Sequence, residues 1–161
     1  MTIRSAIAVV AALALFAGCG SDDKSPTAAD QPPPPPSGRV EVSIGAAAVD
    51  AEVADDNAEL ARGLGGRDRL ARDAGMYFVL TNDRPRFWMK GMRFPLDMIW
   101  IKDGRVVDVT ADVPDEPRGT PDSRLPSYSP ARTANRVLEV NAGWARRHDV
   151  RRGDRVRLTA L

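Results

Sequence analysis

From Arg39 onward, the chain repeats short runs in which apolar and polar residues alternate. Val40, Val42 and Ile44 are separated by polar or small residues, and residues 49–53 follow the same pattern. Because successive side chains of a strand point to opposite faces, a period of two predicts strands that are half buried in a core. The chain is therefore expected to fold mainly as β-structure.

Further apolar runs predict strands at residues 76–80, 96–101, 106–109, 136–140 and 156–158. Asp103-Gly104 lies between two of these runs and is a strong hairpin signal. Asp56, followed three residues later by Glu59, resembles a capping box at the start of a short helix. Asn141 is expected to cap a second short helix, which ends at Arg147.

These elements predict a mainly β (α+β) fold with five to seven short strands and two small helices. The expected architecture is a closed or partly closed β-barrel-like sheet, because closure hides edge strands. The proline-containing segment 112–130 is expected to be a long loop, of the kind that often forms a lid or a binding loop.

The amino terminus resembles a bacterial lipoprotein signal peptide. Arg4 supplies a positive charge, residues 6–17 form an apolar run too short to span a bilayer, and Phe16-Ala17-Gly18-Cys19 resembles a lipobox. Residues 1–18 are thus expected to be removed and Cys19 to carry acyl lipid such as palmitate. The resulting protein would be extracytoplasmic and held at a bacterial cell membrane by lipid.

Residues 19–38 are rich in Ser, Asp, Pro and Ala and contain the run Pro32–Pro36. A segment of this composition cannot bury enough apolar surface to fold, and consecutive prolines favour an extended conformation. The segment is expected to be a disordered tether, followed by a single globular domain at residues 39–161.

Composition excludes several classes of function. The formal net charge of +1 does not favour nucleic-acid binding, and one cysteine cannot form an internal disulfide. The single histidine, His148, excludes the usual multi-histidine metal sites and is expected to be a solvated cation at a helix end. No cofactor is expected, and the domain is expected to be a monomer.

Two carboxyl groups stand within apolar strands. Asp97 interrupts the run at residues 96–101, and Glu139 lies between Leu138 and Val140. A buried carboxylate is costly unless it is paired or hydrogen-bonded. Asp97 is therefore expected to meet Lys90 or Arg93, or backbone N–H groups, whereas alternation alone allows Glu139 to face solvent.

The alternative interpretation places these groups in a ligand or partner site. Its candidate residues are Trp88, Met89, Lys90, Asp97, Tyr128 and Glu139. A weaker possibility is a Cu(I) site, since thioethers suit that ion and Met89, Met92 and Met98 lie close in sequence. Methionine also fills irregular cores, which is the competing interpretation.

Three stretches, residues 61–80, 87–109 and 134–156, resemble the bacterial and archaeal family known as domain of unknown function 192. The most specific part runs from Phe87-Trp88-Met89-Lys90 to Pro95-Leu96-Asp97 and the Asp-Gly hairpin. The resemblance implies a compact β-dominated domain and supplies no reaction, ligand or catalytic residue.

The expected function is a membrane-anchored binding or accessory module without catalysis. The alternative is a hydrolase of a cell-envelope substrate that uses Asp97 or Glu139. Residues 132–157 hold eight arginines against three acidic residues, and this excess could meet an anionic envelope polymer or protein.

Overall fold

The computed structural model describes residues 38–161. Its elements are β1 (Arg39–Ile44), β2 (Ala47–Ala54), α1 (Asn57–Arg62), β3 (Ala74–Val79), β4 (Phe87–Trp88), β5 (Leu96–Lys102), β6 (Arg105–Val113), the 3-10 turn η2 (Asp122–Arg124), β7 (Ser127–Tyr128), β8 (Arg136–Asn141), α2 (Trp144–Arg147) and β9 (Val156–Ala160). The signal peptide, Cys19 and nearly all of the expected tether lie outside the described residues. Within the described part, no helix is long and apolar enough to cross a membrane.

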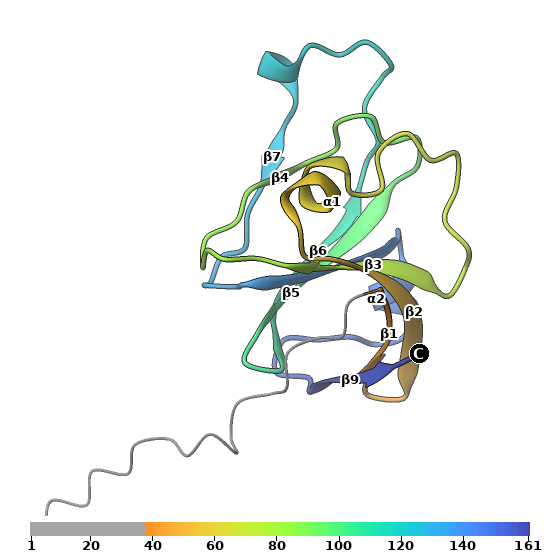
Figure 1. The fold of residues 1–161 in the computed structure, drawn as a ribbon, viewed down its shortest axis with the longest axis vertical. Coiled ribbons are helices and arrows are strands. Elements are labelled where there is room, and N and C mark those ends of the chain that lie inside the picture. Colours follow the sequence, from red (N-terminus) through yellow and green to blue (C-terminus); the bar gives the residue numbers. More distant parts are fainter. Residues whose placement is uncertain (1–37) are drawn as a thin grey trace, which may run out of the picture. The chain divides into compact units, whose positions relative to one another are not determined.

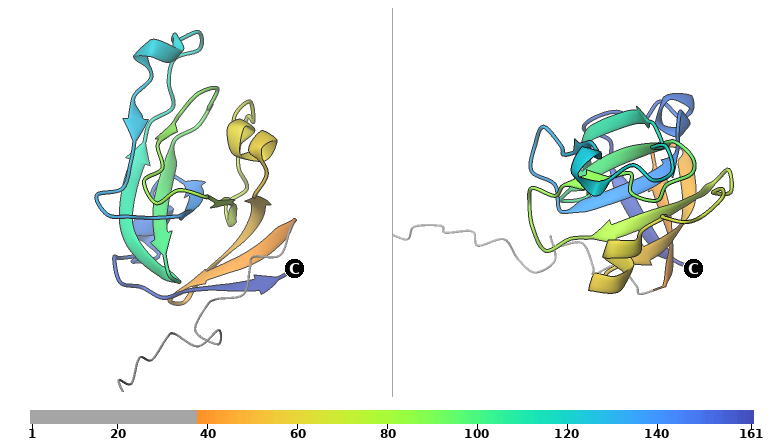
Figure 2. Two further views of the ribbon diagram at one scale, coloured as in Figure 1. Left: turned by 60° about the vertical axis from the view of Figure 1, so that its left-hand side comes forward. Right: turned by 90° about the horizontal axis from the view of Figure 1, so that it is seen from above.

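Seven strands form one sheet in the order β6-β5-β8-β3-β2-β1-β9. The pairs are antiparallel except β2–β3, which is parallel. The sheet curls into a half-barrel (Figures 1 and 2), and an isolated bridge joins Arg105 to Arg155 near its two edges. The expected mainly β fold with a partly closed sheet and two short helices is confirmed.

Apolar side chains cover both faces of the central strands. One cluster, which includes Val42, Ile99 and Trp144, lies on one face. The other includes Met76, Phe78 and Trp100. Six consecutive residues of β5 are buried as a result, which explains why its sequence shows an apolar run instead of alternation.

Helix α1 follows its sequence signal. The side chain of Asp56 accepts a hydrogen bond from Glu59 N at 2.8 Å, as an N-cap residue does. The expected cap at Asn141 is wrong, because Gly143 is the N-cap of α2. The Asn141 side chain instead donates to the carbonyl oxygens of Leu70 and Ala71, and so ties the segment before β3 to the end of β8.

The segment expected to be one long loop, residues 112–130, is partly ordered into elements. Strand β6 continues to Val113, η2 forms a single turn, and β7 pairs with β4 to make a separate two-stranded sheet. Figure 2 shows this arm extending beyond the main sheet on the same side as α1. The arm and α1 thus stand next to the face of the sheet that carries Phe78 and Trp100.

Candidate functional site

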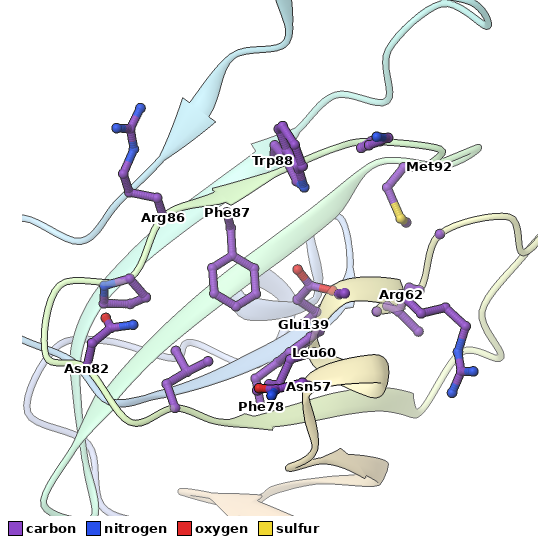
Figure 3. A pocket seen from close by; sticks show the side chains of 17 residues that line it. Asn57, Leu60, Arg62, Phe78, Asn82, Arg86, Phe87, Trp88, Met92 and Glu139 are labelled. Carbon is purple, nitrogen blue, oxygen red and sulfur yellow. The ribbon is translucent and has the colours of Figure 1, made fainter. Parts of the chain in front are cut away.

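An open pocket of about 370 Å³ lies between α1, the main sheet and the β4 segment. Its walls combine apolar and aromatic side chains with six polar or charged ones, and its volume is in the range of small-molecule sites. The lining residues are Asn57, Leu60, Ala61, Arg62, Gly63, Leu64, Gly65, Phe78, Leu80, Asn82, Pro85, Arg86, Phe87, Trp88, Lys90, Met92 and Glu139. Figure 3 shows their side chains.

Glu139 lies at the centre of this group of side chains (Figure 3). On β8 it stands opposite Met76 of β3 and Met98 of β5, so its nearest partners in the sheet are apolar. The residue is 5% exposed. The alternation argument, which allowed a solvent-facing Glu139, is wrong because α1 and the β4 segment cover this face of the sheet.

The carboxyl group of Glu139 has neither an ion pair nor a side-chain hydrogen bond within residues 38–161. Burial alone raises its pKa from 4.5 to about 8, because desolvation disfavours the charged form. The group is therefore mostly a neutral acid at pH 7. A shifted carboxyl group that opens to a pocket is a candidate functional group on physical grounds.

Aromatic rings organise the wall beside Glu139. Phe87 makes edge-to-face contacts with Phe78 and Trp100, with centroids 5.0 and 5.6 Å apart. This arrangement fixes the Phe87 ring between the sheet and the pocket. The next residue, Trp88, is 48% exposed and faces outward at the rim.

Three basic residues line the same pocket: Arg62 at the end of α1, and Arg86 and Lys90 on either side of β4. Lys90 Nζ pairs with Asp122 at 2.6 Å and lies 5.3 Å from the centre of the Trp88 ring. Arg86 donates to Ser127 Oγ at 3.0 Å. These contacts connect the pocket rim to the arm.

Asp97 has a structural role on the opposite face. It is fully buried, and its oxygens accept hydrogen bonds from the backbone N–H groups of Asp112, Gly143 and Ala145 at 2.8 to 3.0 Å. Asp112 lies at an irregularity in the β5–β6 pairing, where a ladder hydrogen bond is lost. Asp97 thus provides the hydrogen-bond acceptor for the backbone N–H groups at the bulge and at the start of α2.

Backbone N–H groups, one of the two kinds of partner expected for Asp97, are observed, whereas the expected pairing with Lys90 or Arg93 is wrong. Lys90 pairs with Asp122, and Arg93 pairs with Asp68. Asp97 does not line the pocket, whereas Glu139 does. The two carboxyl groups therefore belong to different places in the fold.

The other candidate residues divide in the same way. Trp88 and Lys90 line the pocket together with Glu139. Tyr128 is half-buried and pairs across the small sheet with Phe87, outside the lining. Met89 and Met98 are buried in the cluster around Phe78, and thioethers at such positions fill a core.

Met92 is the methionine that reaches the pocket. No group of three or more His, Cys, Asp or Glu residues that could hold a metal lies within residues 38–161. His148 is the C-cap of α2, and its ring lies 4.5 Å from that of Trp144. It does not line the pocket.

Several pocket residues were not among the sequence-based candidates, chiefly Arg62, Phe78, Arg86 and Phe87. Arg86 and Phe87 directly precede the candidate Trp88, so their position in the sequence could have indicated that they belong to the same site. No sequence pattern indicated Arg62 or Phe78 as site residues, because only the packing of α1 over the sheet brings them together.

Fold and site together define a class: a small curled β-sheet domain with an open pocket and a mostly buried acid inside it. The family DUF192, described as uncharacterized ACR, matches residues 40–158. The chain therefore belongs to the family of domain of unknown function 192.

Two solved structures share the fold. A protein of unknown function from Novosphingobium aromaticivorans is 32% identical, with a TM-score of 0.62 over 74% of this chain and 83% of the other. A putative transcription regulator from Sinorhizobium meliloti is 27% identical, with a TM-score of 0.65 over 76% of this chain and 94% of the other. No curated protein matches the chain.

Proposed function

We propose that this protein is a lipid-anchored binding protein of the cell envelope that holds a small, partly apolar ligand in the Glu139 pocket without transforming it. The observation that carries the binding role is the buried Glu139 carboxyl group, which opens to the pocket and has no partner within residues 38–161. Its oxygens remain open to the pocket, since Trp144 Nε1 is the one fully buried side-chain atom without a partner among the described residues, and a polar group in such a mostly buried place is costly unless something bonds to it. A ligand that bonds to Glu139 would recover part of that cost.

The envelope location rests on the amino-terminal sequence. The apolar run at residues 6–17 ends in a lipobox-like Phe16-Ala17-Gly18-Cys19, and the proline-rich segment that follows suits a spacer. A domain attached in this way would meet its ligand outside the cytoplasm. The same lipid would consume the chain's only thiol.

The hydrolase alternative cannot use Asp97 in this pocket, because Asp97 accepts hydrogen bonds from three backbone N–H groups on the other face of the sheet. A reaction in this pocket would depend on Glu139 alone. A carboxyl group with a pKa of about 8 is suited to general acid catalysis. Turnover of an envelope ester or glycoside that is abolished by Glu139→Gln would therefore favour the enzyme over the binding protein.

The binding role is tested with phenylbutanol, a neutral compound with one aromatic ring and one hydroxyl group. Saturation-transfer NMR on the full chain in zwitterionic lipid nanodiscs measures the compound in contact with protein. Leu60→Trp places a larger ring in the pocket, and Leu158→Trp is the matched control on β9, since Leu158 is half-buried and does not line the pocket.

Wild type and Leu158→Trp should show saturable binding, and Leu60→Trp should lose it. Equal signals from all three proteins would mean that the compound does not enter the pocket. That result would overturn the proposed binding role if the phenylbutyl acids and amine described below also failed to distinguish Leu60→Trp.

A further inference from the structure

The charges around the pocket are unequal between its mouth and its interior. Arg62, Arg86 and Lys90 are exposed at the mouth, and Glu139 is the one acidic residue among the lining side chains. Arg62 and Arg86 form no ion pair within residues 38–161. In Figure 3 these two arginines lie on opposite sides of the pocket, with their guanidinium groups directed outward.

The interior is suited to an apolar body. Its lining includes the apolar side chains of Leu60, Leu64, Phe78 and Phe87. In the sheet, Glu139 is flanked by Met76 and Met98. Burial keeps Glu139 mostly neutral at pH 7, since its pKa is raised to about 8. A neutral acid can lie against an apolar group and can donate its proton to a carbonyl or hydroxyl oxygen.

We infer that the pocket selects an amphiphilic anion, in which one carboxylate or phosphate group is carried on an apolar body. The body lies between α1 and Phe87, over Glu139, and the anionic group lies at the mouth, where the side chain of Arg62 or of Arg86 turns toward it. Guanidinium groups match both carboxylate and phosphate oxygens. This inference rests on the proposed binding function and names its ligand class.

The charge pattern opposes a cationic ligand. Such a ligand would pass Arg62 and Arg86 at the mouth, and it would have to ionise a carboxyl group that burial holds neutral. An anion gains from the same mouth, since electrostatic complementarity favours both its capture and its orientation. Ionised Glu139 would repel it, so retention of the anion should depend on the protonation of this residue.

The test uses four compounds that share a phenyl ring on a short alkyl chain and differ in their end group: phenylbutyrate, phenylbutyl phosphate, phenylbutanol and phenylbutylamine. Affinities are measured for the full chain in zwitterionic lipid nanodiscs at pH 7. One of the two anions should bind about tenfold more tightly than the alcohol, and the amine should bind most weakly. The tighter anion identifies the preferred head group as carboxylate or phosphate.

The double variant Arg62→Gln/Arg86→Gln should lose most of the difference in affinity between the anion and the alcohol. Arg69→Gln is the matched control, because Arg69 is exposed in the segment that follows α1 and does not line the pocket. Between pH 7 and pH 9 the affinity for the anion should fall about tenfold, as a group with a pKa of about 8 loses its proton. Glu139→Gln should flatten that dependence.

Equal binding of all four compounds, or tightest binding of the amine, would overturn the ligand class while leaving the pocket as a binding site. An affinity for the anion that rises with pH would do the same. Failure of all four compounds to distinguish wild type from Leu60→Trp would instead reject the proposed binding function itself.

Discussion

Asp97 and Glu139 show that burial alone does not assign a role to a carboxyl group. Asp97 stands directly opposite Val140 in the β5–β8 pairing, one position along from Glu139, so the two side chains leave the sheet on opposite faces. Asp97 is 0% exposed and Glu139 is 5% exposed. The difference lies in their partners, since three backbone N–H groups meet Asp97 and none meets Glu139 within residues 38–161.

Replacing Asp97 should therefore damage the fold. Asp97→Ala leaves three backbone N–H groups near β6 and α2 without their acceptor, at a cost of about 3 kcal/mol in the free energy of unfolding. Urea denaturation of the full chain measures this loss. Asp115→Ala is the control, because Asp115 is exposed in the arm; equal stability of the two variants would contradict the structural role of Asp97.

Replacing Glu139 should change how stability depends on pH. Its pKa is about 8 in the fold and near 4.5 in an unfolded chain, so the folded state holds more protons between these values. The free energy of unfolding should then fall as pH rises from 5 to 8, by on the order of 4 kcal/mol from this residue.

Glu139→Gln cannot ionise, so it should lose most of this pH dependence and be more stable than wild type at pH 8. Urea denaturation at several pH values compares the two proteins. Identical pH profiles would mean that Glu139 is not desolvated in the fold.

At the scale of elements, short helix α1 forms one wall of the pocket and depends on its cap. The Asp56 side chain accepts the Glu59 N–H at 2.8 Å, and Arg67 holds the following loop by a bidentate ion pair with Glu52. Asn57, Leu60 and Arg62 of this helix are among the residues that line the pocket. Loss of the cap should therefore disturb the pocket wall as well as destabilise the helix.

Asp56→Ala should lower the free energy of unfolding by about 1 kcal/mol and weaken binding of the phenylbutyl anions. Asp55→Ala is a matched control, since this exposed neighbour contributes only its backbone N–H to the Glu59 contact. Thermal unfolding and the nanodisc titration measure the two effects. Equal losses in both variants would show that charge, and not the cap, is responsible.

The sequence was most informative about elements with local signals. Period-two alternation predicted β1 and β2, Asp103-Gly104 predicted the β5–β6 hairpin, and Asp56 predicted the start of α1, as observed. The cap of α2 was missed because its acceptor is Asp97, far away in the chain. Long-range contacts of this kind leave no local pattern.

The same reason limits what the sequence said of the site. Glu139, Trp88 and Lys90 were candidates, and the pocket brings them together. Alternation could not reveal that Glu139 is buried, because the covering comes from α1 and the β4 segment. Nor could it separate Glu139 from Asp97, since both are acidic residues within apolar strands.

At the scale of the whole molecule, the proposed anchor and the described domain are separate parts. Cys19→Ala should prevent lipidation and shift the protein from the membrane fraction to the soluble fraction, because the acyl lipid would be its attachment. Fractionation with detection of the protein measures this shift. Full retention of Cys19→Ala at the membrane would contradict the lipoprotein proposal without affecting the pocket.

The most direct test of the account is the titration of Glu139 itself. NMR of the side-chain carboxyl carbon, assigned by comparison with Glu139→Gln, follows its protonation in the free protein. A midpoint near pH 8, shifted upward when a phenylbutyl anion is bound, is the predicted result. A midpoint at the ordinary value near 4.5 would contradict the buried, unpartnered acid on which the proposed site depends.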